Sequence, residues 1–145
     1  IFRISAPYGY VSNQSVLPKF INFAKQDKNK ELWGSGSRSQ VFTFVEDIGY
    51  ACSLAMGRKS VNGIYNITGN KSITMSELAK MVLDEIPNTK SKIVFLNTDD
   101  PEEGQKINIP IHKAKREMGF EPQFNLLEGL RLITNDQEKH FWSSK

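Results

Sequence analysis

Residues 33 to 56 read WGSGSRSQVFTFVEDIGYACSLAM, and this stretch predicts a turn, a strand and a helix in succession. Gly34 and Gly36 mark the turn, because glycine adopts positive φ at little steric cost. β-Branched and aromatic residues at 41–45 favour an extended strand. Asp47 is expected to end that strand and to cap the following helix, since a carboxylate accepts the free N–H groups of a first turn. The apolar residues of this helix follow at helical spacing: Ile48, Ala51, Cys52 and Ala55.

The remainder of the chain alternates strand and helix signals, which predicts a mixed α/β fold with short strands and about five helices. Thr74 with Glu77, and Asn125 with Glu128, have the spacing of capping boxes at helix starts. The expected helices begin near residues 15, 47, 74, 110 and 125, and the expected strands cover 1–5, 31–33, 41–45, 64–67 and 92–96.

Composition argues against two classes of partner. Of the 145 residues, 39% are hydrophobic and 24% are charged, as is typical of one ordinary globular domain. The net charge of +3 is small and the lysines are scattered, so we expect no basic face for nucleic acid. The apolar runs are far shorter than the roughly 18 residues that a membrane span needs. We therefore expect neither nucleic acid nor membrane as a partner.

Cysteine usage and the acidic residues give no catalytic or metal site. Cys52 is the only cysteine, so no internal disulfide can form and a cytoplasmic location is expected. Its place on the apolar face of a helix favours a small buried side chain over a nucleophile. The run of four acids lacks histidine and ligand spacing, so we interpret it as a solvated loop. These acids are Asp99, Asp100, Glu102 and Glu103.

Residues 34–47 resemble the "G-x-G-x-x-x-R-x-F-x-x-V-x-D" element of extended short-chain dehydrogenases/reductases, the NAD-dependent sugar-nucleotide epimerases and dehydratases. Four more segments are similar to family motifs, in the family's order and over nearly the whole chain. Each motif alone is weak, but together they are fairly specific. They are residues 3–9 (RISAPYG, for R-x-x-N-x-Y-G), 16–21 (VLPKFI, for V-I-P-x-F-I), 63–67 (GIYNI, for G-x-Y-N-I) and 113–122 (KAKREMGFEP, for K-A-K-x-E-L-G-F-x-P).

Two parts of the family's machinery are missing from the sequence. The family's catalytic pair is Tyr-x-x-x-Lys, in which lysine lowers the tyrosine pKa so that the phenol can act as acid or base. The dinucleotide fingerprint is a glycine-rich turn between strand and helix, whereas the turn at 34–36 leads into a strand. No tyrosine here has lysine four places on: Tyr8, Tyr10, Tyr50 and Tyr65 are followed at that distance by Ser12, Gln14, Leu54 and Gly69.

These omissions lead us to expect that residues 1–145 form a single substrate-binding, C-terminal domain. An N-terminal Rossmann domain, absent from this chain, would bind NAD or NADP and carry the catalytic pair. The strand at 1–5 is expected to belong to that absent domain. The resemblance accordingly implies no cofactor and no catalytic residue within this chain, and it leaves room for a homodimer of the full-length form.

The resemblance also implies a slot for a nucleotide base. Val16, Leu17 and Pro18 would line one side of it, and Leu32 with Trp33 would form the opposite wall. The alternative is that these side chains are plain core, because a tryptophan between a leucine and a glycine turn suits either role. Tyr8 lies on the segment that, in the family, passes beside the cofactor and the sugar.

The chain departs from the family where the substrate diphosphate is bound. The family's arginine stands at the position of Gln40, which can donate hydrogen bonds but carries no charge. Arg38 could supply the missing guanidinium if the strand extends that far, and the alternative is a solvated turn arginine. Ala6 replaces an asparagine that often contacts substrate, and Asp99 and Asp100 lie near a second phosphate-binding arginine of some members.

The sequence therefore favours the substrate-binding C-terminal portion of an NAD(P)-dependent sugar-nucleotide epimerase/dehydratase-like enzyme. Its partners would be a nucleotide sugar or a related small molecule and the absent Rossmann domain. The alternative is a non-catalytic ligand-binding module derived from the family, suggested by Gln40, Ala6 and Asp100. A nucleic-acid-binding domain, suggested only by the pI near 9.0, ranks lowest. The residues do not distinguish epimerase, dehydratase and reductase.

Overall fold

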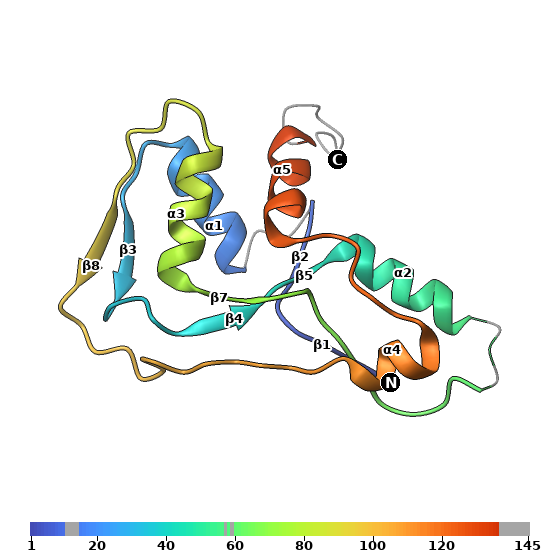
Figure 1. The fold of residues 1–145 in the computed structure, drawn as a ribbon. Coiled ribbons are helices and arrows are strands. Elements are labelled where there is room, and N and C mark those ends of the chain that lie inside the picture. The colour runs from blue at the N-terminus through green and yellow to red at the C-terminus, as the bar shows by residue number, and fades with distance from the viewer. Residues whose placement is uncertain (11–14, 57, 59, 137–145) are drawn as a thin grey trace.

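A computed structural model describes residues 1–10, 15–56, 58 and 60–136 of the chain. Short strands alternate with five helices in this part, which confirms the mixed α/β class (Figure 1). The elements are β1 (Phe2–Ile4), β2 (Pro7–Tyr8), α1 (Val16–Lys25), β3 (Lys30–Trp33), β4 (Ser39–Val41), β5 (Thr43–Phe44), α2 (Val45–Ala55), β6 (Tyr65–Ile67), β7 (Ser72–Thr74), α3 (Met75–Glu85), β8 (Ile93–Leu96), α4 (His112–Met118) and α5 (Leu126–Asp136).

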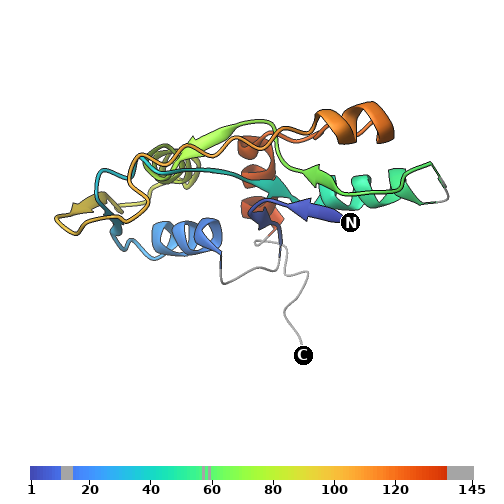
Figure 2. The ribbon, with the colours of Figure 1, turned by 90° about the horizontal axis from the view of Figure 1, so that it is seen from below.

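The strands pair two by two over the described residues. Three pairs are parallel, β1 with β6, β2 with β5 and β3 with β8, and β4 pairs with β7 antiparallel. The β3–β8 pair lies at one end of the molecule and the β1–β6 pair toward the other, and the segment from β8 to α4 runs between the ends (Figures 1 and 2). Residues far apart in sequence therefore meet at both ends.

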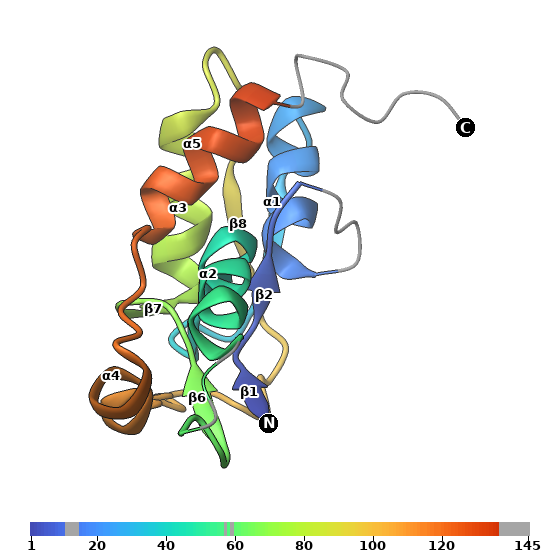
Figure 3. The same cartoon turned by 90° about the vertical axis from the view of Figure 1, so that its right-hand side faces the viewer.

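Two hydrophobic clusters hold these elements together. In the larger cluster α3 contacts both α1 and α5, and these three helices group together in Figure 3. The smaller cluster joins α2, β6 and α4 and includes Ala51, Tyr65, Ile67, Ala114, Met118 and Phe120. Burying one large apolar side chain contributes roughly 1.5–3 kcal/mol, so both clusters are substantial. The largest fully buried side chains are Tyr65, Phe44, Phe120, Leu17 and Ile21.

Local signals at the helix ends are confirmed. Thr74 and Glu77 form the expected capping box, with the Glu77 N–H donating to Thr74 Oγ1 at 3.1 Å. Asn125 and Glu128 exchange the equivalent bonds before α5. Gly119 ends α4 with φ of 74°, as a C-terminal glycine is expected to do. These features depend on residues only a few positions apart, which is why the sequence predicts them.

The single strand expected at 41–45 is wrong, because Phe42 separates β4 from β5. The break coincides with a change of partner: Gln40 in β4 lies opposite Ile73 of β7, whereas Phe44 in β5 lies opposite Tyr8 of β2. One short run of sequence thus connects the β3–β8 end of the molecule to its centre.

Asp47 does not cap α2, contrary to expectation. The helix begins at Val45, after Phe44 as its N-cap residue, so Asp47 already lies inside the first turn. Its side chain is buried, and Oδ1 accepts the backbone N–H of Gln123 at 2.7 Å. Asp47 instead anchors the segment between α4 and α5 to α2.

Cys52 is exposed, so its expected burial is also wrong. The predicted face of α2 holds at Ala51 and Ala55, whereas Cys52 does not belong to it. Ala51 is fully buried, and Tyr50, Leu54 and Ala55 pack partly buried against the smaller cluster. Cys52 follows Ala51 by about 100° around the helix and therefore faces away from this cluster.

Candidate functional site

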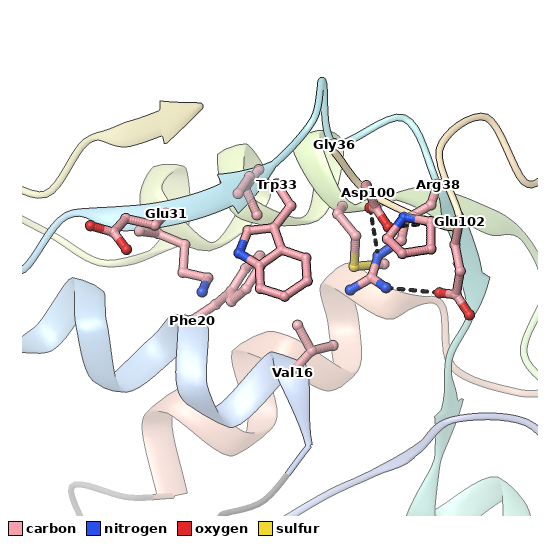
Figure 4. Close-up of a pocket in the computed structure, with 12 residues that line it drawn as sticks. Val16, Phe20, Glu31, Trp33, Gly36, Arg38, Asp100 and Glu102 are labelled. Atoms are coloured by element: carbon pink, nitrogen blue, oxygen red, sulfur yellow. Dashed lines mark hydrogen bonds and ion pairs between the residues drawn. The ribbon is translucent and has the colours of Figure 1, made fainter. Parts of the chain in front are cut away.

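A cavity of about 470 Å³ opens beside the β3–β8 end of the molecule (Figure 4). It is formed by the start of α1, strand β3, the glycine turn after β3, the first residue of α3 and the acidic loop after β8. Its lining residues are Val16, Phe20, Lys30, Glu31, Leu32, Trp33, Gly36, Arg38, Met75, Asp100, Pro101 and Glu102.

One wall of the cavity is apolar. Trp33, the last residue of β3, is 56% exposed, which is unusual for so large an apolar residue. Its indole lies across from Val16 at the start of α1 (Figure 4). Phe20 and Leu32 are buried and form the floor. Apolar side chains therefore line this part of the cavity on both sides.

Lys30 places a positive charge beside this wall. Its Nζ lies 5.0 Å from the centroid of the Phe20 ring and 5.1 Å from that of Phe23, which are cation–π distances. Burial lowers the pKa of the Lys30 ammonium from its ordinary value, because desolvation disfavours the charged form. Glu31 opposes this shift and also lines the cavity.

Arg38 lies at the other end of the cavity, paired with two carboxylates. Its Nη1 is 2.8 Å from Glu102 Oε2, and its Nε is 3.4 Å from Asp100 Oδ2. The Asp100 side chain is only 5% exposed, against 41% for Arg38 and 56% for Glu102. Arg38 is therefore not a plain solvated arginine. Asp100 is nearly buried, so the solvated position that we expected for it from the sequence is wrong.

The acidic loop is fastened to the glycine turn by a further carboxylate. Glu103 accepts the backbone N–H and the hydroxyl of Ser35 and the hydroxyl of Ser37. These hydrogen bonds lower the pKa of Glu103, because they favour its charged form. Backbone bonds continue the contact on both sides, from Gly34 N–H to Thr98 O at 2.9 Å and from Ser39 N–H to Gln105 O at 2.8 Å.

The structure brings four of the residues singled out in the sequence to this cavity, namely Val16, Leu32, Trp33 and Arg38. Gln40 lines a smaller adjoining cavity of about 190 Å³, which shares Val16 and Arg38 with the first. The Oε1 atom of Gln40 is buried, with no hydrogen-bond partner among the described residues.

The other three predicted site residues do not line this cavity: Tyr8 and Leu17 belong to the larger hydrophobic cluster, and Pro18 is buried in α1. Leu17 is fully buried in α1, and Pro18 is buried next to it. Tyr8 is 3% exposed and contacts the rings of Phe42 and Phe44. Burial, the largest cause, and the nearby negative charges of acidic residues raise the pKa of Tyr8 well above its ordinary value.

Several lining residues had no signal in the sequence as site residues. Met75 reaches the cavity because β7 pairs with β4 and so brings the start of α3 beside Arg38. Phe20 lies on the apolar face that helical spacing predicts for the first helix, and Glu31 lies on a predicted strand, but neither was predicted as a site residue. The one signal in the sequence that could have pointed to Glu102 is its charge, because the acidic loop is complementary to the arginine in the glycine turn.

The described residues contain neither a metal-binding cluster nor a membrane-spanning helix. No group of three or more His, Cys, Asp or Glu side chains there is arranged to hold a metal ion. None of the helices in this part of the chain has the length and apolar character needed to cross a membrane.

Comparison with known proteins gives the family. The family model "NAD dependent epimerase/dehydratase family" matches residues 1–68. UDP-glucuronic acid decarboxylase 4 of Arabidopsis thaliana is 31% identical over 137 residues, which is 94% of this chain and 30% of that protein. dTDP-glucose 4,6-dehydratase of Haemophilus influenzae is 28% identical over 142 residues, 90% of this chain and 42% of that protein.

Solved structures of similar fold agree. UDP-glucose 4-epimerase of Thermotoga maritima, solved with UDP-glucose, matches with a TM-score of 0.81 at 23% identity over 95% of this chain and 45% of that one. UDP-glucuronic acid 4-epimerase of Bacillus cereus, solved with UDP-glucuronic acid and NAD, also gives 0.81, at 21% identity over 97% and 45%. At these identities the likeness shows the fold.

Over the described residues the fold is mixed α/β, and the 470 Å³ cavity has an aromatic wall and charged lining residues. The chain belongs to the NAD-dependent epimerase/dehydratase family. It spans about 30% of the length of the first curated relatives it matches and 45% of the chains of similar solved structures.

Proposed function

We propose that this chain is the substrate-binding, C-terminal portion of an NAD(P)-dependent sugar-nucleotide epimerase/dehydratase-like enzyme. The observation that carries the proposal is the exposed indole of Trp33 facing Val16 across the 470 Å³ cavity. That volume lies within the range of small-molecule sites, and an exposed tryptophan at a cavity mouth suits a planar base. The base would lie between Trp33 and Val16, with the phosphates toward Arg38.

The division of labour follows from what the residues can do. No tyrosine in the sequence is followed four places on by lysine, and Tyr8 is buried among aromatic rings. The residues around the cavity can bind and orient a ligand. Such positioning supplies a large part of the rate enhancement of an enzyme. Hydride transfer and the acid–base step are assigned to an N-terminal domain that would hold NAD or NADP.

The β1–β6 pair supports a second domain at that end of the molecule. Parallel sheets are normally covered on both faces. Ile1 is 82% exposed and Ile4 is 40% exposed, on or beside a parallel strand of only three residues. Apolar groups so placed favour burial against another domain, and the Rossmann domain is the occupant that we propose.

Calorimetric titration of UDP and dTDP into the chain tests the proposal. These nucleotides are the nucleoside-diphosphate parts of the sugar nucleotides named for the relatives. We expect saturable binding of at least one of them and no comparable binding of NAD. Saturable binding of NAD at micromolar concentration, or no binding of either nucleotide at millimolar concentration, would contradict the proposal.

A second candidate function is a ligand-binding module without catalysis. The pairing of Arg38 with Asp100 and Glu102, and the neutral Gln40 in the adjoining cavity, favour it because they weaken the charge available for a diphosphate. The coding sequence upstream of Ile1 distinguishes the two candidates. A glycine fingerprint and a Tyr-x-x-x-Lys pair there support the enzyme, and the lack of both supports the module.

A further inference from the structure

The one arginine on the cavity wall is already bound by the chain's own carboxylates. Glu102 accepts a hydrogen bond from Arg38 Nη1 at 2.8 Å, and Asp100 approaches Nε at 3.4 Å. Among the charged lining residues, Lys30 and Arg38 stand against three carboxylates. The cavity therefore carries a formal charge of about −1 before any ligand enters, and an incoming phosphate meets repulsion as well as attraction.

The position of Glu102 is fixed by its neighbours in the loop. Its own backbone N–H donates to Asp100 Oδ1 at 3.0 Å. The next residue, Glu103, is hydrogen-bonded to Ser35 and Ser37, and Gly104 N–H donates to Ser37 Oγ at 3.0 Å. An exposed ion pair usually contributes little because two long side chains must be ordered. Here the backbone beside Glu102 is already ordered, so its carboxylate stays close to Arg38.

We propose that Glu102 is a specificity-determining residue that competes with ligand phosphate for Arg38. The proposal rests on the nucleotide-binding role given above and deepens it. Affinity in this site comes mainly from the nucleoside, held between Trp33 and Val16, and the diphosphate adds little. A diphosphate near Arg38 therefore gains less affinity here than it would from an arginine without this partner.

The test compares uridine with UDP by calorimetry for the wild type and two variants. Glu102→Gln removes the negative charge next to Arg38 and keeps the side-chain shape. Glu31→Gln removes the same charge from the far end of the same cavity, where Figure 4 shows Glu31 well apart from Arg38. Thermal denaturation of each variant checks that it is folded.

We expect UDP to bind the wild type no more than about threefold tighter than uridine. In Glu102→Gln, UDP should tighten by about tenfold with uridine unchanged, because one repulsive charge is lost and Arg38 Nη1 no longer has a charged partner, while Asp100 still pairs with Nε. Glu31→Gln should change the ratio of UDP affinity to uridine affinity by less than half as much as Glu102→Gln does. UDP binding at least tenfold tighter than uridine in the wild type, with the ratio unchanged in Glu102→Gln, would overturn the competition while leaving nucleotide binding intact.

Inorganic pyrophosphate separates this inference from the proposed function. It should raise the melting temperature of Glu102→Gln more than that of the wild type or Glu31→Gln. If it does so while neither uridine nor UDP binds any variant, the competition stands and nucleotide binding fails. If pyrophosphate stabilises all three proteins equally, Glu102 does not compete for Arg38 and the inference is wrong.

Discussion

Trp33 is the residue on which ligand recognition is proposed to depend. Trp33→Ala should weaken nucleotide binding by roughly 5- to 100-fold, because stacking of one base on an aromatic ring contributes about 1–3 kcal/mol. Stability should change little, since the indole is more than half exposed. Phe95→Ala is the matched control, an aromatic residue of β8 that is 52% exposed and does not line the 470 Å³ cavity. Equal losses in the two variants, measured by calorimetry, would contradict the stacking role.

Asp47 gives a prediction on stability. Burial raises the pKa of its carboxyl, against the opposing effect of the Gln123 N–H bond. A carboxyl with a raised folded-state pKa makes its most favourable contribution at low pH and loses it as pH rises through that pKa. At neutral pH, Asp47→Asn removes the buried charge and keeps the acceptor, so it should be at least as stable as the wild type.

Asp47→Ala, in contrast, leaves the Gln123 N–H without its acceptor and should lower the free energy of unfolding by about 1–3 kcal/mol. Urea denaturation of the three proteins at neutral pH and at pH 4 measures both effects. The advantage of Asp47→Asn over the wild type should shrink at the lower pH. If Asp47→Ala matches Asp47→Asn at neutral pH, the anchoring role assigned to Asp47 is wrong.

For single residues, the sequence predicts which residues line the cavity better than it predicts which residues they contact. The resemblance, which rests on residues close together in the chain, singled out Trp33 and Leu32, and both line the cavity. The partners of Arg38 do not, because Asp100 and Glu102 lie more than 60 positions away and reach it only after β8 has paired with β3. Burial of Tyr8 is equally non-local, since its neighbours come from β5.

The contact between the glycine turn and the acidic loop determines the shape of the cavity, and Glu103 makes it sensitive to pH. The pKa of Glu103 is lowered from 4.5 by hydrogen bonds from Ser35 and Ser37. A carboxylate whose pKa is lowered on folding stabilises the folded protein at pH values above its ordinary pKa. That stabilisation is lost as the pH falls through the folded-state pKa. Glu103→Gln should therefore lower the melting temperature at pH 7.

That difference between Glu103→Gln and the wild type should shrink as the pH falls below about 4.5, where the wild-type carboxylate becomes protonated. Asp99→Asn is the control, an exposed acid of the same loop. Thermal denaturation at several pH values makes the measurement. A constant difference across the whole range would show that the charge of Glu103 does not contribute.

Two glycines in neighbouring elements should respond to alanine in opposite ways. Gly34 has φ of +54°, and a Cβ added there would overlap the Glu103 carboxylate, so Gly34→Ala should cost about 1–2 kcal/mol or more. Gly49 lies inside α2 with open space where its Cβ would stand. Gly49→Ala should stabilise by about 0.5–1 kcal/mol. Urea denaturation compares them, and destabilisation by Gly49→Ala would contradict the open space found there.

Elements were predicted well where their signals are local. The capping boxes at Thr74 and Asn125 need only the residue three places on. The break between β4 and β5 was missed because it depends on which strand each half pairs with. Cys52 was wrongly included in the buried face of α2, because the cluster formed with α4 and β6, and not the helical spacing alone, decides which neighbours of Ala51 are buried.

Over the whole molecule, the sequence predicts the α/β class and the helices but not the pairing. Within the part of the chain that the structure describes, three of the four strand pairs are parallel, and each joins strands separated by long stretches of chain. Hydrophobic period gives no information on such pairings, and only the resemblance of ordered motifs suggested the architecture. The cavity arises from one of these pairings, since β8 carries the acidic loop to the glycine turn that follows β3.

The central claim is that this chain itself holds the nucleotide part of a sugar nucleotide, at the β3–β8 end. A crystal structure of the chain soaked with UDP-glucuronic acid tests it most directly. We predict a base between Trp33 and Val16, with its phosphates toward Arg38. A nucleotide found instead in the 750 Å³ cavity beside α4, lined by His112, Lys115 and Arg116, would contradict the account.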